Sequence, residues 1–216
     1  MNLTGLAVGA HTFQIRATDG AGNQDPTPAS FAWTVTAPAA SCGTTTTLTA
    51  TADSWIDQGS RSSNKGTDSN LKVMSKSSNA LRTLVRFTMP PLPAGCVVQT
   101  ATLRLYAASH KTGRTLQALP IAATWAEGSV TWNNQPATTA TPATTSSGSG
   151  WREWNVATQL QAAYTANLLH GFLIRDAVET NDHEQQFNSR EQSSNRPQLV
   201  LTFVAASTPA LSTAMR

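Results

Sequence analysis

The residues with the most evident chemistry are basic side chains concentrated in the middle of the chain. Between positions 58 and 120 the sequence has nine lysines and arginines but only one acidic residue, Asp68. The rest of the chain has six basic and eleven acidic residues, so the formal net charge of +3 conceals a strong asymmetry. Because such groups form charge-assisted hydrogen bonds to anions, the segment predicts an acidic partner. The nine basic residues are Arg61, Lys65, Lys72, Lys76, Arg82, Arg86, Arg104, Lys111 and Arg114.

Two segments with alternating polarity indicate how some of these charges are displayed. In segments 71–76 and 101–106, leucines and valine alternate with more polar residues. Successive side chains of a strand point to opposite faces, so the polar residues of each segment face outward. If both strands belong to one sheet, its outer face forms a candidate binding surface. We expect it to contain Lys72, Lys76, Arg104 and Tyr106, with Arg82 and Trp55 as weaker candidates.

This combination of cations and an aromatic ring suits an acidic polysaccharide. Uronate carboxylates accept hydrogen bonds from arginine and lysine, and a tyrosine ring offers a flat apolar surface to a sugar. A structural interpretation stays open, because lysines on exposed strands also keep sheet edges soluble. Nucleic acid is a poor match, because interleaved aromatic residues are too few for a stacking platform.

Carboxylates near the predicted first strand of the main domain are candidates for a metal site. Asp53 and Asp57 share a face with Trp55 by strand alternation, and carboxylate oxygens suit calcium. Their spacing matches no calcium-binding loop that we can identify. We therefore expect no required cofactor and treat calcium as an optional ion.

Catalytic motifs are incomplete in this sequence. The segment 183–187 begins like the zinc motif H-E-x-x-H, but Phe187 replaces the second histidine. No nucleophile elbow, Walker A loop or dinucleotide-binding glycine pattern occurs, and nothing singles out two carboxylates as a glycosidase pair. We predict that the protein is not an enzyme.

The two cysteines, Cys42 and Cys96, favour a disulfide over two free thiols. Neither belongs to a C-x-x-C pair, so a cysteine zinc site is not expected. Each lies next to a glycine at the edge of a predicted strand. A disulfide implies an oxidising compartment, which agrees with a Thr/Ser-rich composition with only 12% charged residues. No apolar run reaches the roughly 18 residues of a membrane span.

The hydrophobic pattern predicts an all-β fold. Short alternating segments are separated by turn-rich stretches, and only Val156–Ala166 has helical periodicity. We predict an antiparallel β-sandwich of jelly-roll type with one short helix. The expected strands are Leu48–Asp57, Leu71–Ser75, Arg82–Met89, Thr100–Ala107, Thr115–Ile121, Trp151–Asn155, Gly171–Asp176, Glu184–Ser189 and Leu199–Val204.

The first 38 residues form a separate segment. Two alternating stretches flank the turn-rich sequence 20–26, and two strands alone cannot bury a sandwich core. The segment resembles the last two strands of a bacterial immunoglobulin-like repeat, so we expect a remnant of such a domain at 1–38. A Pro/Ala/Thr linker is expected at 39–47, the main domain at 48–204 and a spacer tail at 205–216.

Short motifs of the main domain occur in a characteristic order. They are Ala52-Asp53 before Trp55-Ile56, then Asn64–Gly66, Leu71–Val73, Leu84–Phe87, Leu92–Gly95, Ala101–Tyr106, Trp125–Glu127, Val130–Pro136, Gly171–Leu173, Phe187–Glu191 and Arg196–Val200. Together they resemble the DNRLRE domain, a family also described as a carbohydrate-binding module, over roughly residues 47–204. The resemblance implies a non-catalytic β-sandwich from secreted microbial proteins, found beside polysaccharide-degrading domains.

Each motif also has a structural interpretation. Trp125 and Trp132 suit packing roles, and the charged Arg86 and Arg190-Glu191 suit internal ion pairs, because buried charges need partners. We expect a secreted, monomeric module that binds an acidic polysaccharide and holds an attached domain near it. The alternative is a structural or adhesive spacer with no ligand of its own. No nucleic acid or membrane partner is expected.

Overall fold

The computed structural model describes residues 5–35, 42–139 and 141–206. The chain divides into two compact units, Met1–Ala40 and Ser41–Arg216, which we describe separately. Residues 39–41 of the expected linker and 207–216 of the expected tail lie outside the described residues.

The N-terminal unit is a single antiparallel pair of strands, β1 (Gly9–Ile15) and β2 (Ala29–Val35). Its register places Phe13 opposite Phe31, and His11 opposite Trp33. One face of this pair is apolar but open to solvent, with Phe31 67% exposed and Ile15 62% exposed. The turn between the strands is closed by Asp19, whose carboxylate accepts the N–H groups of Ala21 and Asn23.

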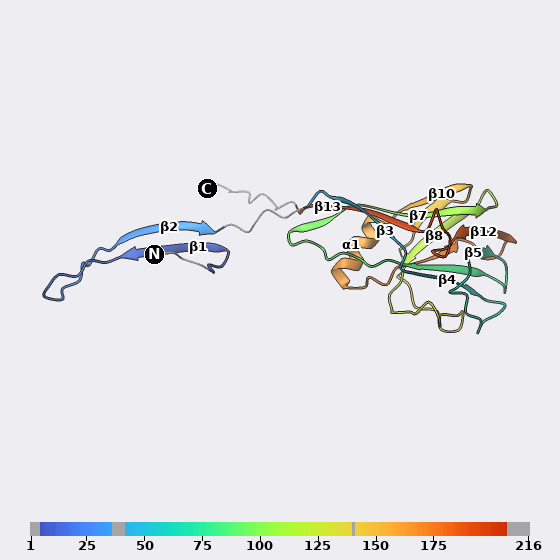
Figure 1. Ribbon diagram of the computed structural model, residues 1–216, viewed down its shortest axis with the longest axis horizontal. Coiled ribbons are helices and arrows are strands. Elements are labelled where there is room, and N and C mark those ends of the chain that lie inside the picture. Colours follow the sequence, from blue (N-terminus) through green and yellow to red (C-terminus); the bar gives the residue numbers. More distant parts are fainter. Residues whose placement is uncertain (1–4, 36–41, 140, 207–216) are drawn as a thin grey trace, which may run out of the picture. The chain divides into compact units, whose positions relative to one another are not determined.

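The main unit is one curled antiparallel sheet of eleven strands with a short helix, consistent with a β-sandwich of jelly-roll type (Figure 1). The order along the sheet is β3-β13-β7-β12-β5-β6-β11-β8-β9, with β10 added beside β7 and β4 beside β6. The strands are β3 (Thr45–Thr49), β4 (Ala52–Asp57), β5 (Asn70–Ser75), β6 (Leu81–Arg86), β7 (Cys96–Ser109), β8 (Thr115–Pro120), β9 (Ala143–Ser146), β10 (Gly150–Asn155), β11 (Phe172–Asp176), β12 (His183–Asn188) and β13 (Gln198–Ala205).

The sheet folds over between β5 and β6, where one residue pair, Met74 and Leu81, links the two strands. The "first half" comprises β3, β13, β7, β10, β12 and β5; the "second half" comprises β4, β6, β11, β8 and β9. Thr83 Oγ1 donates to the Lys72 carbonyl 2.9 Å away, so this side of β6 faces β5. The buried Trp154 joins the halves, because its indole N–H on β10 donates to the Leu116 carbonyl on β8 at 3.1 Å.

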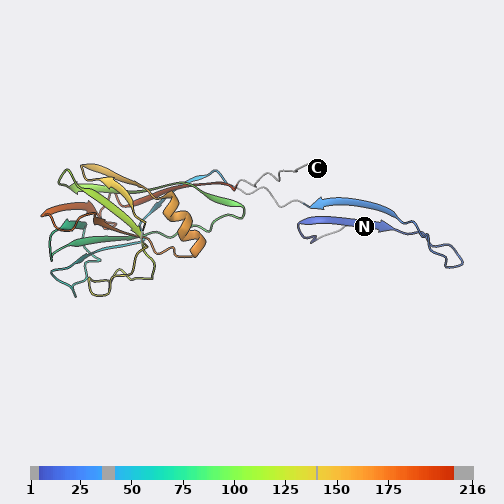
Figure 2. The same cartoon turned by 180° about the vertical axis from the view of Figure 1, so that it is seen from behind.

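A second, smaller core covers the opposite side of the second half. The connection 122–136 folds back over β4, β6, β11 and β8 and places Trp125 and Val130 against Leu84 and Leu173. Figure 2 shows the unit from behind, with this connection below the strands. Gly66 is required here because a Cβ atom at that position would lie 2.3 Å from the Glu127 carbonyl oxygen. The prediction that Trp125 is a packing residue agrees with its 7% exposure.

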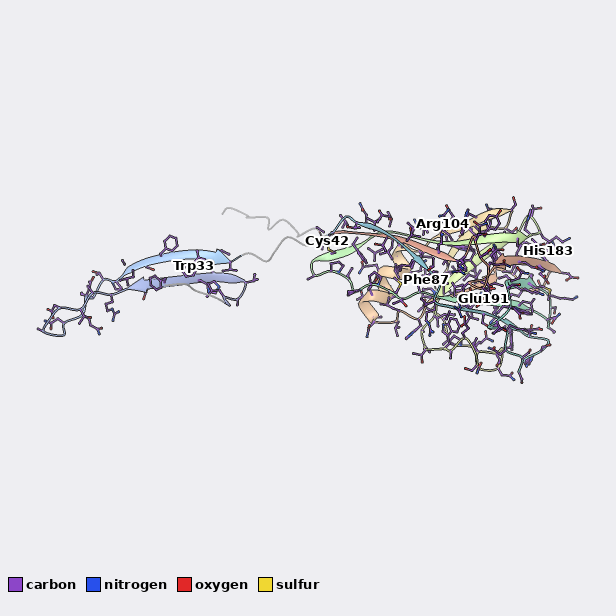
Figure 3. All side chains as sticks on the ribbon, viewed as in Figure 1. Trp33, Cys42, Phe87, Arg104, His183 and Glu191 are labelled. Atoms are coloured by element: carbon purple, nitrogen blue, oxygen red, sulfur yellow. A yellow bond between two sulfur atoms is a disulfide. The ribbon has the colours of Figure 1, made fainter. Side chains whose placement is uncertain are left out.

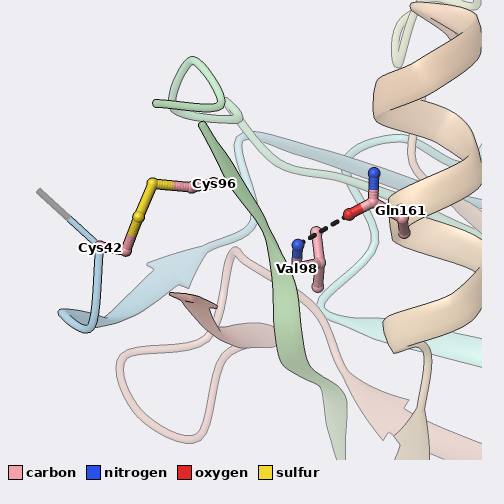
Figure 4. Close-up of a disulfide and its surroundings, with 4 residues drawn as sticks. All are labelled: Cys42, Cys96, Val98 and Gln161. Atoms are coloured by element: carbon pink, nitrogen blue, oxygen red, sulfur yellow. Dashed lines mark hydrogen bonds between the residues drawn. A yellow bond between two sulfur atoms is a disulfide. The ribbon is translucent and has the colours of Figure 1, made fainter. Parts of the chain in front are cut away.

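Helix α1 (Ala157–Ala166) lies at one end of the main unit (Figure 1), and the disulfide lies near it. Gln161 on the helix accepts the N–H of Val98 on β7 at 2.7 Å, and Cys96 at the start of β7 is bonded to Cys42 (Figure 4). The cysteine Cα atoms are 6.1 Å apart, within the range that a disulfide requires. The predicted disulfide is therefore confirmed.

The predicted fold class is confirmed, with differences at particular elements. The expected strand Leu48–Asp57 is two strands, because the chain turns at Ala50 and Thr51. β3 begins at Thr45, so the last residues of the expected linker pair with β13. No strand was expected in the polar stretch 137–150, but it contains β9, which pairs with β8.

Candidate functional site

The side of the first half that is turned away from the core carries a continuous polar surface. Lys72 on β5 lies opposite Gln186 on β12, on the other side of the strand from the fully buried Leu71 and Val73. On β7, Arg104 and Tyr106 likewise alternate with buried leucines. Because β12 pairs with both β5 and β7, the strands that carry Lys72, Arg104 and Tyr106 belong to one sheet surface.

Arg104 and Tyr106 belong to an aromatic and polar cluster on this surface, the "Trp151 cluster" of Arg104, Tyr106, Trp151, Glu153 and Gln198. β10 lies beside β7, with Trp151 opposite Tyr106 and Glu153 opposite Arg104. The Arg104 guanidinium stacks 4.5 Å from the Trp151 ring centroid, and Tyr106 meets this ring edge-on at 5.5 Å. Arg104 also donates to Glu153 at 2.8 Å and to Gln198 at 3.1 Å. The cluster therefore combines aromatic surface with compensated charge.

Lys72 belongs to a second cluster, the "Trp55 cluster" of Trp55, Lys65, Asp68 and Lys72. The ammonium groups of Lys65 and Lys72 lie 5.2 and 5.0 Å from the Trp55 ring centroid. The indole N–H donates to Asp68 at 2.9 Å, and Trp55 is only 6% exposed. The ring is therefore covered by the lysines and by its packing against Met74 and Leu81, so it offers little area to a sugar. Within the described part of the chain, neither ammonium has a carboxylate oxygen within 4.0 Å.

The other two residues expected at this surface lie apart from the clusters. Lys76 follows β5 and forms an exposed ion pair with Asp182 at 3.6 Å. Arg82 is on β6 in the second half, next to Thr83 but on the opposite side of the strand. It stacks on Trp132 at 4.5 Å and forms two hydrogen bonds to Glu179, at 2.8 and 2.7 Å. Arg82 therefore does not extend the surface that carries Lys72.

The nine basic residues of the central segment do not converge as a group. Arg114 pairs with the buried Asp176, donating through Nε at 2.9 Å. Arg86 stacks on Trp125 at 5.2 Å and donates to its carbonyl at 2.8 Å, in place of the carboxylate partner that the sequence suggested. The expectation that Arg82 lies on the surface of Lys72 is therefore wrong, and Arg86 and Arg114 do not join that surface either. Sequence position alone did not show which strands would lie on opposite sides of the core.

The carboxylates considered for a metal ion behave differently from one another. Asp53 is buried and lies with Glu127 and Glu191 in a group whose nearest oxygens are all within 4.8 Å of one another. Asp57 is not in this group; its carboxylate accepts the Gly59 N–H at 2.7 Å. Arg190 lies in the group and donates to both Glu127 oxygens, at 2.7 and 2.8 Å. Its guanidinium thus supplies positive charge where a cation would otherwise be needed.

The same carboxylate group has an unusual protonation equilibrium. Burial raises the pKa of Asp53 from 3.8 to about 7, and the carboxylates of Glu191 and Glu127 add to this increase. The backbone N–H of Arg190, which donates to Asp53 at 2.8 Å, opposes it. In Figure 3, Arg104 lies along the upper edge of the main unit and Glu191 well below it, so this group is separate from the Trp151 cluster.

Comparison with protein families places this chain in a known class. The family model of carbohydrate-binding module family 96 matches residues 44–203, which is most of the chain and the whole curled sheet apart from the last residues of β13. The chain belongs to carbohydrate-binding module family 96. This is the family formerly named DNRLRE. A search of curated proteins gave no match.

The family 96 assignment defines the general function of the main unit. These modules bind carbohydrate and are not catalytic, as the sequence predicted. No helix in the described ranges is long and apolar enough to cross a membrane. The family gives no ligand for this chain, so the ligand has to be inferred from the side chains.

Sequence reasoning missed two residues of the surface, Trp151 and Gln198. Trp151 lies on the opposite side of β10 from the buried Trp154, so its outward direction could have been predicted from alternation. Its position opposite Tyr106 could not, because residues 110–149 separate the two strands and nothing in the sequence specifies that they pair. Gln198 was hidden for the same reason, since it meets Arg104 across β13 and β7.

Proposed function

We propose that this family 96 module binds an acidic polysaccharide on the outer surface of the first half and so holds an attached domain near its glycan. The observation that carries the proposal is the Trp55 cluster, where two ammonium groups lie about one indole ring without a carboxylate partner in the described residues. The cluster has two ammonium groups and one carboxylate, Asp68, so a bound uronate carboxylate would compensate its excess positive charge through charge-assisted hydrogen bonds.

The Trp151 cluster supports the same proposal through different chemistry. Its arginine charge is already compensated by Glu153, so it has less attraction for a free anion. It offers edge-on aromatic rings, an amide and a carboxylate, which suit the faces and hydroxyls of sugar rings. We propose that an extended chain places acid groups at the Trp55 cluster and sugar rings at the Trp151 cluster. Lys76 stays a candidate at the margin, paired with Asp182.

The test compares polygalacturonate with its uncharged methyl ester, which has the same backbone, and adds alginate as an acidic polymer with a different backbone. Binding of the chain to polygalacturonate, alginate and fully methyl-esterified pectin is measured by isothermal titration calorimetry at several salt concentrations. We expect binding to the two acidic polymers that weakens as salt rises, and much weaker binding to the ester. Equal binding to ester and acid would overturn the proposal.

Matched variants locate the surface. The double variant Lys65→Gln/Lys72→Gln removes the two unpaired ammonium groups, and the control Lys111→Gln removes an exposed lysine from the turn after β7. We expect the double variant to lose roughly 10- to 100-fold in affinity, the value of about one hydrogen bond to a charged group. Lys111→Gln should bind like the unmodified chain. Equal affinities for the two variants would contradict the assignment.

The N-terminal unit supports a rival proposal, that the chain is a spacer in a multidomain surface protein. Its two strands expose an apolar face, as the final strands of an immunoglobulin-like domain would without their partners. Absence of binding to every neutral and acidic polymer would favour this spacer function. Both proposals place the protein outside the cell, which the Cys42–Cys96 disulfide supports.

A further inference from the structure

A second polar platform lies on the second half, on the side turned away from β5. The register between β11 and β6 ends with Leu173 opposite Leu84 and Ile174 opposite Thr83. Arg175 and Arg82 are the next residues along the two strands, so two arginines occupy neighbouring positions on adjacent strands. Thr83 faces β5, and Arg82 is on the opposite side of β6. The platform therefore faces away from the surface that carries Lys72.

The charge balance of this arginine pair is incomplete. Like charges at neighbouring cross-strand positions destabilise a sheet. Arg82 is compensated, because Glu179 accepts two of its hydrogen bonds and Gln135 accepts a third at 2.9 Å. Arg175 donates through Nε to the Gln117 side chain at 2.9 Å. Among the described residues, Arg175 has no carboxylate oxygen within 4.0 Å. The platform therefore carries one uncompensated guanidinium.

The surroundings of the pair are held in place before any ligand arrives. Trp132 stacks on Arg82 and packs against the small core below it. Its carbonyl accepts the Gln135 amide at 3.0 Å, so Gln135 is held between the Trp132 backbone carbonyl and the Arg82 guanidinium. On the other side of Arg175, Gln117 lies opposite Thr144 on β9. Arg175 thus lies between Arg82, which binds Gln135, and Gln117, which is paired with Thr144.

We propose that this platform is a second carbohydrate-binding site, which takes the carboxylate of an acidic sugar residue on the terminal nitrogens of Arg175. Arginine presents a planar fork that matches a carboxylate in two parallel hydrogen bonds. Gln117, Gln135 and Thr144 then contact hydroxyls of the same or the next sugar. The proposal rests on the acidic ligand proposed above and makes the module bivalent, with sites on opposite sides of the core.

Stoichiometry with a short ligand tests the second site. The unmodified chain is titrated with oligogalacturonate and with oligoalginate of a length too short to reach around the unit. We expect two sites per chain. The variant Arg175→Gln should retain one site, dependent on Lys65 and Lys72, and Lys65→Gln/Lys72→Gln should retain the other. Arg175→Lys keeps the charge but loses the fork, so we expect it to bind several-fold more weakly at that site.

A second readout uses polymer crosslinking, because a bivalent module joins two chains. Mixtures with polygalacturonate should become turbid or viscous with the unmodified chain and with Lys111→Gln, but not with Arg175→Gln at equal folded fraction by circular dichroism. One site per chain that is unchanged by Arg175→Gln overturns this inference and leaves the proposed function intact. Absence of binding to both acidic oligosaccharides overturns both.

Discussion

The raised pKa of Asp53 makes the stability of the main unit depend on pH in a direction that is unusual for a carboxylate. The carboxyl is nearly fully buried, at 1% exposure, and its pKa is raised from 3.8 to about 7. Between these values the folded chain holds a proton that the unfolded chain releases. Stability from this group is therefore fully present below about pH 4 and is lost as the pH rises through about 7.

The magnitude follows from the size of the shift. One pKa unit corresponds to about 1.4 kcal/mol, so the roughly three units at Asp53 correspond to about 4 kcal/mol. The variant Asp53→Asn has no charge to bury, and its side-chain oxygen can still accept the Arg190 N–H that now reaches Asp53 at 2.8 Å. We expect Asp53→Asn to match the unmodified chain near pH 4 and to be more stable by up to about 4 kcal/mol at pH 8.

Urea unfolding of both proteins at steps from pH 4.5 to pH 8.5 measures this difference. Groups that titrate identically in the two proteins cancel in this comparison. The pH dependence of the difference in unfolding free energy therefore reports Asp53 and its coupling to Glu127 and Glu191. For a unit of this size, the melting temperatures should diverge by roughly 10 °C over the same range. A difference between the two proteins that is flat with pH would refute the reasoning.

Two further results are expected. The variant Cys42→Ser/Cys96→Ser opens a loop with a sequence separation of 54 residues and should lower the free energy of unfolding by about 4 kcal/mol. Reduction of the unmodified chain should lower it by the same amount. An unchanged unfolding midpoint in the variant would contradict this prediction. Calcium should leave the melting temperature unchanged, because Arg190 already supplies positive charge to Asp53, Glu127 and Glu191. A melting temperature that rises with calcium and falls again with a chelator would instead support an ion at Asp53.

Alternation and turn chemistry were sufficient to predict most of the fold. Segments such as 101–106 alternate cleanly, and they form strands because every second side chain is buried. β9 was missed because Ala143–Ser146 is threonine-rich and contributes a single buried residue, Ala143, so its sequence does not differ from that of a polar loop. Pairing with β8 makes it a strand, and pairing is a property of the tertiary fold.

The site was harder to predict because it depends on which strands meet. Alternation gave the correct outward direction for Lys72, Arg104 and Tyr106, and these residues share one sheet surface. It gave no information on the distance between strands, so Trp151 was not recognised as a partner of Tyr106. Arg82 obeys the same alternation, but β6 follows the point at Met74 and Leu81 where the sheet folds over. The outward side of β6 therefore faces the opposite direction from the outward side of β5.

The first and last described residues of the main unit, where the chain enters and leaves it, lie next to each other. Gly43 donates its N–H to the Phe203 carbonyl at 2.7 Å, Ala205 pairs with Cys96, and Cys96 is bonded to Cys42. A pulling force applied through the flanking segments would therefore enter and leave through a few adjacent residues with a covalent crosslink among them. Tension would bypass most of the sheet, so both proposed glycan surfaces should keep their shape while the protein is under load.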